Sequence, residues 1–171
     1  MNNLIIGNIF SFFSASCLAI SVTRQSKKGV LIWQIYNISF YLIAGVLLQT
    51  YAALVTSSVA LLRNVLAYKD KLTMRLTLIL VIFGAAFSLY VNNLGIIGMM
   101  PVVASVEYTT CIYISKNEQH LRYAFVVNAL LWALHNYFVR AYPSSLVNVF
   151  LVVWTMLQIF INRKKFAKEK K

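Results

Sequence analysis

The 171 residues are 60% apolar and only 12% charged, and Lys and Arg exceed Asp and Glu by 16 to 4, for a net charge of +12. Soluble domains contain about 25% charged residues, and one of this size could not bury so much apolar surface. The low polarity excludes a disordered chain. A basic nucleic-acid-binding protein would carry its charge on a polar surface, so we expect no nucleic-acid partner. The composition therefore predicts a multi-pass membrane protein whose main partner is the lipid bilayer.

Seven segments of the chain are apolar enough to cross a bilayer, which takes about 20 mainly apolar residues. We expect an all-α protein with seven transmembrane helices, at residues 4–22, 30–48, 52–68, 76–91, 94–114, 123–139 and 144–161. The short links between these segments make neighbouring helices antiparallel. The prediction is a single transmembrane domain over residues 1–161, followed by a basic cytoplasmic tail over 162–171.

The positions of the basic residues predict the orientation of these helices. Fourteen of the sixteen lie in the links after the first, third and fifth segments and in the tail, which seven spans place on one side of the membrane. The opposite side has only Arg140, and Arg63 lies inside the third segment. Lys and Arg are concentrated on the cytoplasmic side of membrane proteins. We therefore expect the N-terminus outside and the C-terminus in the cytoplasm, with the tail against anionic lipid.

Shifting the chain by 91 residues against itself reveals a weak internal repeat. The shift places Ile5-Ile6-Gly7 on Ile96-Ile97-Gly98, Ser14 on Ser105, Asn37 on Asn128, Tyr51 on Tyr142 and Leu66 on Leu157. It aligns the first three segments with the last three, in the same orientation. The sequence therefore predicts two parallel three-helix units, 4–68 and 94–161, joined by one linker helix at 76–91. Transporters with such parallel repeats hold their substrate near the membrane midplane, between the repeats.

Three ionisable residues lie within the predicted spans: Arg63, Glu107 and His135. Such groups are costly in a bilayer and usually face the interior of the bundle. Arg63 and Glu107 both lie three residues to the cytoplasmic side of the centre of their spans, about 4–5 Å from the midplane at the rise of an α-helix. They form either a neutralised ion pair between the two units or part of a site for substrate binding or proton coupling. His135 is either a hydrogen-bonded structural residue or a proton carrier.

The sixth span carries a polar stripe at helical spacing. Its members are Asn128, Trp132, His135 and Asn136, at positions i, i+4, i+7 and i+8. Asn37 is the counterpart of Asn128 in the repeat, and Asn148 of the seventh span lies near the depth of His135. Amides donate and accept hydrogen bonds and aromatic rings stack, so this set suits a neutral, hydroxyl-bearing or heteroaromatic small molecule. The alternative is hydrogen bonding between the helices themselves.

Sequence motifs for other chemistries are missing from the chain. It has no HExxH motif, no carboxylate cluster and no Ser/His/acid spacing, so we expect no enzyme activity. Cys17 and Cys111 both lie in apolar segments, and neither a metal site nor a cofactor is expected. All ten Lys lie in links or in the tail, which excludes a retinal Schiff base within a span.

In its short motifs the chain resembles the YgjV-type bacterial inner-membrane proteins, whose function is not established. The resemblance rests on Trp132-Ala-Leu-His135-Asn136-Tyr137, Met100-Pro101-Val102, Leu62-Arg63 and Lys27-Lys28. That family is similar in architecture to the group of SWEET sugar transporters, PQ-loop proteins and PnuC-type vitamin transporters, although this chain has no Pro-Gln pair. The resemblance implies a solute carrier of facilitator type in the bacterial cytoplasmic (inner) membrane.

Two functions follow from the sequence. The first is a small-solute transporter or facilitator with a polar cavity at the midplane. We expect its substrate-binding residues to be Asn37, Arg63, Glu107, Asn128, Trp132, His135, Asn136 and Asn148. The second is a non-transporting membrane module that stabilises or regulates a partner. A midplane cavity favours the first function and a solid bundle the second. The identity of the solute and the oligomeric state stay open, a homo-oligomer included.

Overall fold

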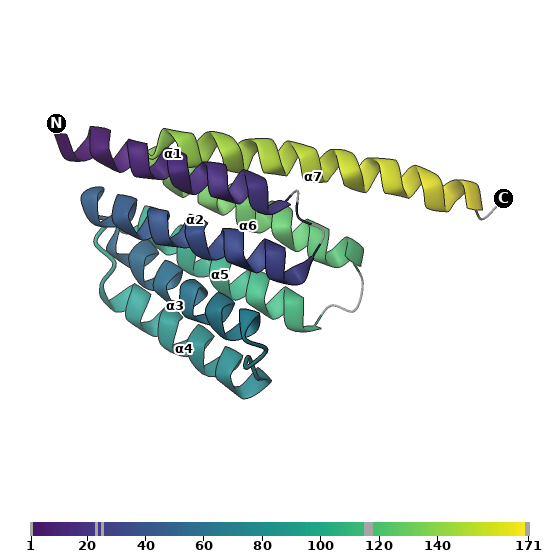
Figure 1. Cartoon of the computed structure of the whole chain (residues 1–171), viewed down its shortest axis with the longest axis horizontal. Helices are drawn as coiled ribbons and strands as arrows, with labels where there is room; N and C mark the ends of the chain where they lie inside the picture. The colour runs from purple at the N-terminus through teal and green to yellow at the C-terminus, as the bar shows by residue number, and fades with distance from the viewer. Residues whose placement is uncertain (1, 23, 25, 115–117, 170–171) are drawn as a thin grey trace.

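The computed structural model describes residues 2–22, 24, 26–114 and 118–169, which form seven helices and no strand. The helices are α1 (Asn2–Val22), α2 (Lys27–Leu47), α3 (Tyr51–Tyr68), α4 (Met74–Tyr90), α5 (Ile96–Ile114), α6 (Glu118–Phe138) and α7 (Tyr142–Glu169). They run back and forth along one common direction, and the C-terminal part of α7 extends beyond the other helices (Figure 1). The predicted all-helical class with seven helices is confirmed.

The helix ends agree with the predicted segments to within three residues, except at two places. Helix α6 begins at Glu118 rather than at 123, and α7 continues to Glu169 rather than ending at 161. Lys, Arg and Glu are good helix formers, so a helix continues past the apolar part of its sequence. The apolar pattern therefore predicts the apolar part of each helix rather than its ends. Most of the predicted basic tail belongs to α7.

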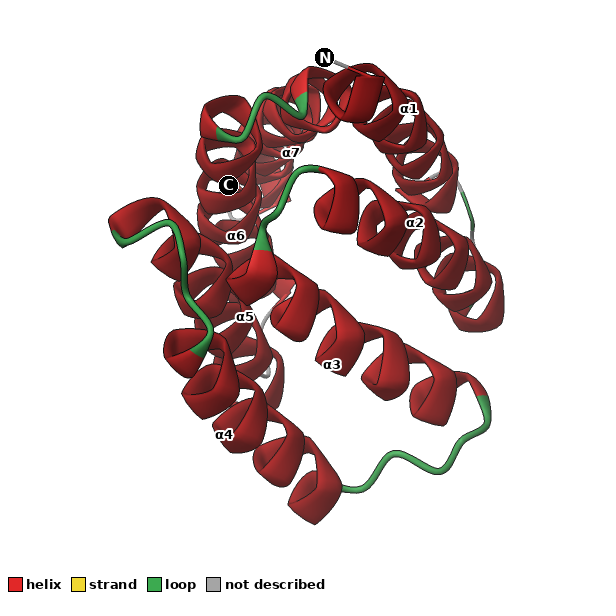
Figure 2. Ribbon diagram, turned by 90° about the vertical axis from the view of Figure 1, so that its left-hand side faces the viewer, coloured by secondary structure: helices red, strands yellow, loops and turns green. Residues whose placement is uncertain are grey.

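Three of the described helices, α1, α2 and α3, are long and apolar enough to cross a membrane. Shorter apolar helical segments lie in α4, α5 and α7, at Met74–Tyr90, Ile96–Cys111 and Tyr142–Leu157. Neighbours in sequence pack against each other, and in addition α1 contacts α7 and α3 contacts α5. Figure 2 shows α1 and α2 on one side of the bundle and α5 and α6 on the other. Helix α4 packs only beside α3 and α5, at the edge of the bundle.

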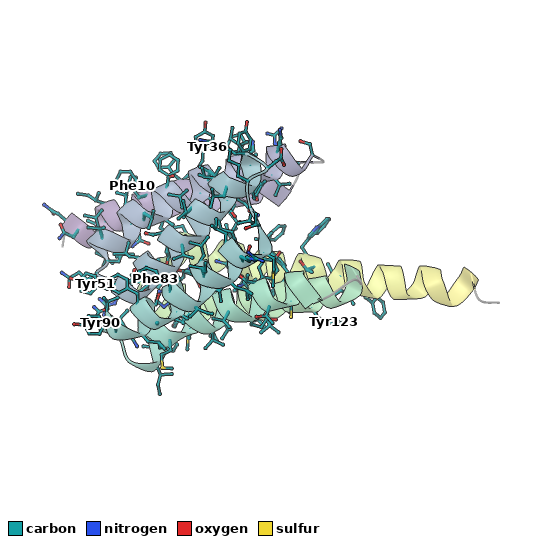
Figure 3. The ribbon with its side chains drawn as sticks, turned by 90° about the horizontal axis from the view of Figure 1, so that it is seen from below. Phe10, Tyr36, Tyr51, Phe83, Tyr90 and Tyr123 are labelled. Carbon is teal, nitrogen blue, oxygen red and sulfur yellow. The ribbon has the colours of Figure 1, made fainter. Side chains whose placement is uncertain are left out.

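Small residues fill the interior of the bundle, and large apolar residues cover its outside. Ala44, Ala53 and Ala104 are fully buried. Large side chains such as Tyr36 and Tyr90 are exposed, and Figure 3 shows both pointing away from the helices. Helices in lipid associate through small residues that allow close packing, because burying a large apolar side chain gains little over lipid contact. This distribution is the one expected of a bundle surrounded by lipid.

The turns after α2 and after α6 have the same backbone geometry at positions 91 residues apart. Gln49 and Arg140 have φ angles of 56° and 61°, in the left-handed region that few residues with a Cβ adopt. In the first turn, the Thr50 N–H donates to the Gly45 carbonyl at 3.0 Å, and the equivalent bond in the second turn is 2.8 Å long. Both bonds close the end of the preceding helix in the same way.

Each of these two turns is held by an asparagine from the other half of the chain. Asn8 of α1 donates from Nδ2 to the Arg140 carbonyl at 2.9 Å and accepts at Oδ1 from the Tyr142 N–H at 3.2 Å. Asn93, between α4 and α5, makes the same two bonds to the turn after α2, at 2.8 Å and 3.4 Å. We call these two contacts the asparagine clasps. They connect the two halves reciprocally at one end of the bundle.

Replacing either clasp residue, by Asn8→Ala or Asn93→Ala, is expected to lower the free energy of unfolding by about 1 kcal/mol, because each loses two hydrogen bonds to a turn. The measurement is thermal unfolding of the purified protein in detergent. Asn3→Ala, at an exposed position of the same helix as Asn8, is the matched control. Melting temperatures of the clasp variants equal to that of Asn3→Ala would contradict the assignment.

Candidate functional site

A polar cavity of about 180 Å³ lies inside the bundle. Helices α1, α2, α3, α5, α6 and α7 contribute its lining, whereas α4 contributes none of the described lining residues. Six of the eight residues predicted for substrate binding line the cavity: Asn37, Arg63, Asn128, Trp132, Asn136 and Asn148. Glu107 and His135 are not among the lining residues.

Tyr41 and Asn136 bridge two helices at one end of the cavity, which we call its closed end. The Tyr41 hydroxyl donates to Asn136 Oδ1 at 2.9 Å and so joins α2 to α6. The ring of Trp132 lies edge-on to the ring of Tyr41, with centroids 5.4 Å apart. Both partners of the hydrogen bond are buried, with Asn136 only 1% exposed. This closed end is the end nearer the asparagine clasps, because both residues lie in the last two turns before the clasped helix ends.

Two amides on opposite sides of the cavity are each held by one hydrogen bond to a neighbouring helix. The Ser14 hydroxyl donates to Asn37 Oδ1 at 2.6 Å, between α1 and α2. Asn128 donates from Nδ2 to the Ala104 carbonyl at 2.8 Å, between α6 and α5. Each bond fixes the orientation of its amide. Asn37 therefore keeps Nδ2 as a donor for the cavity, and Asn128 keeps Oδ1 as an acceptor.

Arg63 is the only charged residue among the described residues that line the cavity. Its Nη1 donates to the Thr109 hydroxyl at 2.9 Å, which joins α3 to α5. The ion pair found among the described residues is a different one, between Lys28 and Asp70 at 3.5 Å, and both of its side chains are exposed. The described part of the chain thus contains no ion pair between Arg63 and Glu107.

Glu107 lies on the face of α5 that points away from Arg63. The two residues were nevertheless predicted at similar distances from the membrane midplane. Ser105 lines the cavity and Thr109 bonds Arg63, and Glu107 is two residues from each of them. At about 100° per residue, its side chain points to nearly the opposite side of the helix. Its Oε1 accepts from the Cys111 thiol at 3.6 Å within α5. Its Oε2 is buried and has no hydrogen-bond partner among the described residues.

His135 lies behind the cavity, between α6 and α5. It is fully buried, and its Nδ1 is 2.9 Å from the Ile97 carbonyl. A carbonyl only accepts, so Nδ1 carries the hydrogen and Nε2 is the acceptor of the neutral ring. That Nε2 is buried without a hydrogen-bond partner in the described part of the chain. The ring also contacts Trp132 edge-on, with centroids 5.9 Å apart, and so supports the wall of the cavity.

The cavity contains a second pair of amides that the sequence analysis did not select. Asn64 of α3 donates from Nδ2 to Gln34 Oε1 of α2 at 3.3 Å, and both residues line the cavity. Gln34 lies three residues before Asn37, so helical spacing alone places both on one face of α2 and could have identified it. Asn64 directly follows Arg63, and no spacing signal distinguishes it from a residue that faces lipid.

Six pairs of lining residues are separated by the same 91 residues as the two clasped turns. The pairs are Ser14 and Ser105, Gln34 and Phe125, Asn37 and Asn128, Ile38 and Ala129, Tyr41 and Trp132, and Ser57 and Asn148. Corresponding positions in the two halves of the chain therefore face the same cavity. Some pairs have the same kind of side chain, such as the two serines. Others differ, since the residue 91 positions after Gln34 is a phenylalanine.

A comparison with known protein families matches residues 5–165 to the model of the Imp-YgjV family, described as bacterial inner membrane protein. The chain belongs to this family. The match confirms the resemblance seen in the sequence, and it includes every residue that lines the cavity. No curated protein and no solved structure shows significant similarity to the chain. As an Imp-YgjV family member, the protein is a helical protein of the bacterial inner membrane.

The variant Tyr41→Phe is expected to lower the free energy of unfolding by about 1–3 kcal/mol, because it leaves Asn136 Oδ1 buried without its donor. Tyr36→Phe removes the same hydroxyl from an exposed ring of the same helix, and a surface change of this kind stays within about 0.5 kcal/mol. Thermal unfolding in detergent compares the two variants. Equal melting temperatures would show that the Tyr41 hydroxyl does not hold the closed end of the cavity.

Proposed function

We propose that this protein is a facilitator of small-solute transport across the bacterial inner membrane, and that the solute binds in the polar cavity between two three-helix units. The observation that carries the proposal is the cavity itself, about 180 Å³ in volume and lined by amides, hydroxyls and one guanidinium among apolar side chains such as Leu18 and Phe125. Polar groups inside a membrane are costly and mark pathways for solutes and ions. A module that only packs against a partner needs no such cavity, so we place that function second.

Three observations support two units, α1–α3 and α5–α7, with α4 as the linker. The turns after α2 and α6 repeat their hydrogen bonds at a spacing of 91 residues, and the clasps of Asn8 and Asn93 are reciprocal. A shift of 91 residues places α1 on α5 and α3 on α7, so the contact of α1 with α7 corresponds to the contact of α5 with α3. A unit of three helices ends on the opposite side of the membrane from its start. One additional helix is therefore needed to give both units the same orientation.

The length of the helices and the positions of their tyrosines support seven spans. The shortest helix has 17 residues, within the range of about 17–25 that crosses a bilayer. Exposed tyrosines lie at one end of the bundle on three helices, at Tyr51, Tyr90 and Tyr142, and at the other end at Tyr68 and Tyr123. Figure 3 shows Tyr51 and Tyr90 at the same end. Tyrosine is enriched at both membrane interfaces, and the basic links favour a cytoplasmic C-terminus.

The closed end of the cavity suggests how access changes during transport. With the N-terminus outside, the clasps and the Tyr41–Asn136 bond face the exterior, and Arg63 lies nearer the cytoplasm. Figure 3 shows the α1–α2 hairpin diverging from α7 toward the end of the bundle at which Tyr123 lies, which the proposed orientation places in the cytoplasm. We infer that the structure is closed to the exterior. Release of a solute to the outside then requires the bond between Tyr41 and Asn136 to break as the two units rock against each other.

Uptake into proteoliposomes tests the transport function. A panel of radiolabelled sugars, monocarboxylates and vitamins is first screened by thermal shift, and every compound that raises the melting temperature is assayed for uptake. We expect at least one compound to enter faster than into protein-free liposomes. Asn128→Ala should reduce that uptake about tenfold or more, because the cavity loses a fixed acceptor. Asn3→Ala, outside the cavity, should leave the uptake unchanged.

If no compound is taken up above the protein-free level, the facilitator function is contradicted and the non-transporting module is favoured. Equal uptake by Asn128→Ala and by the unchanged protein would show that the solute does not pass through this cavity.

A further inference from the structure

Arg63 faces the cavity, and among the side chains that the structure describes no carboxylate balances its charge. The chain has four acidic residues: Asp70, Glu107, Glu118 and Glu169. Asp70 is paired with Lys28 outside the cavity, and Glu107 lies on the far side of α5. The remaining two are the first residue of α6 and the last residue of α7. An ion pair with Glu107 would have left the cavity neutral, whereas its absence leaves one positive charge there.

The hydrogen bonds of Arg63 leave most of its donors for a ligand. A guanidinium has five N–H donors in a planar fork. The structure gives Arg63 one hydrogen bond, from Nη1 to the neutral hydroxyl of Thr109. Arg63 is partly buried, and a charge withdrawn from water without a counter-charge is unfavourable. A carboxylate binds a guanidinium through two parallel N–H···O bonds and supplies the missing charge at the same time.

The size and the remaining lining of the cavity limit the anion further. A cavity of about 150 Å³ holds a benzene ring, so 180 Å³ holds a ring of that size with one small substituent. Trp132 and Phe125 contribute aromatic rings to the lining, and Asn128 keeps its Oδ1 as an acceptor. A phosphate monoester carries about 1.5–2 negative charges at neutral pH. One arginine would leave part of that charge unbalanced, so a single carboxylate fits better.

We propose that the cavity binds a small organic monocarboxylate, about the size of benzoate, with its carboxylate on Arg63 and its remaining part between Asn128 and Trp132. The inference rests on the proposed facilitator function because it names the substrate class of the same cavity. It replaces the neutral solute expected from the amides alone. The carboxylate also accepts from Asn37 Nδ2, the donor that the Ser14 bond leaves free.

Matched acids and amides test this selectivity by isothermal titration calorimetry on the purified full-length protein in detergent. The probes are benzoate against benzamide and lactate against lactamide, because each pair differs mainly in charge. We expect at least one acid to bind, and to bind about tenfold or more tightly than its amide, since hydrogen bonds to a charged group gain at least that much. Arg63→Gln should abolish the preference for the acid.

Two further variants separate charge from geometry and from folding. Arg63→Lys keeps the charge but loses the planar fork, so it should keep the preference for the acid with a weaker affinity. Arg75→Gln removes one exposed positive charge at the start of α4 and should leave both affinities unchanged. Melting temperatures and size-exclusion profiles identify any variant that does not fold. If Arg63→Gln does not fold, the affinities of Arg63→Lys and Arg75→Gln for the acid are compared instead.

Three results would overturn the monocarboxylate site: neither acid binds, an amide binds as tightly as its acid, or Arg63→Gln keeps the affinity for the acid. These failures are distinct from failure of the facilitator function. Selective binding of an acid without any uptake would contradict transport and leave the site standing. Uptake of a neutral solute without binding of either acid would support transport and refute the monocarboxylate.

Discussion

A polar group inside a bilayer has no water to bind, so its hydrogen-bond partners must come from the helix bundle itself. In this protein many of those partners come from the opposite half of the chain. Tyr41 of α2 donates to Asn136 of α6, and Arg63 of α3 donates to Thr109 of α5. At the end of the bundle, each half clasps a turn of the other with one asparagine. Three of the polar groups that hold the halves together, those of Tyr41, Asn136 and Arg63, also line the cavity, and this arrangement links packing to the proposed transport.

The helical class and the positions of the seven helices were predictable from the sequence because they depend on apolar length and helical spacing, both of which are local. Three residues of the polar stripe on α6, Asn128, Trp132 and Asn136, line the cavity. A stripe indicates one face of a helix but not what lies beside that face at each depth. At the depth of His135, α5 packs directly against α6, and the Ile97 carbonyl takes the place that a ligand would need.

The relation between Arg63 and Glu107 was not predictable for a different reason. The sequence predicts a depth in the membrane for each residue, and the two predicted depths agree. Whether the two side chains face each other depends on how α5 is rotated against its neighbours. That rotation is set by packing between distant segments, which place Thr109 rather than Glu107 beside the guanidinium. A spacing of 91 residues likewise relates positions in the two halves of the chain but not their chemistry. Trp154 stands 91 residues after Arg63 and is half exposed, so only one half of the chain contributes a cation.

The central claim is that Arg63 serves the cavity and is not neutralised by Glu107. A double-mutant cycle with Arg63→Gln, Glu107→Gln and the combined variant tests this claim most directly, through the free energy of unfolding in detergent. The account predicts that the two single effects add to within about 0.5 kcal/mol, as for residues without a shared interaction. A coupling energy above about 1 kcal/mol, as expected of two opposite charges in direct contact within the bundle, would contradict it.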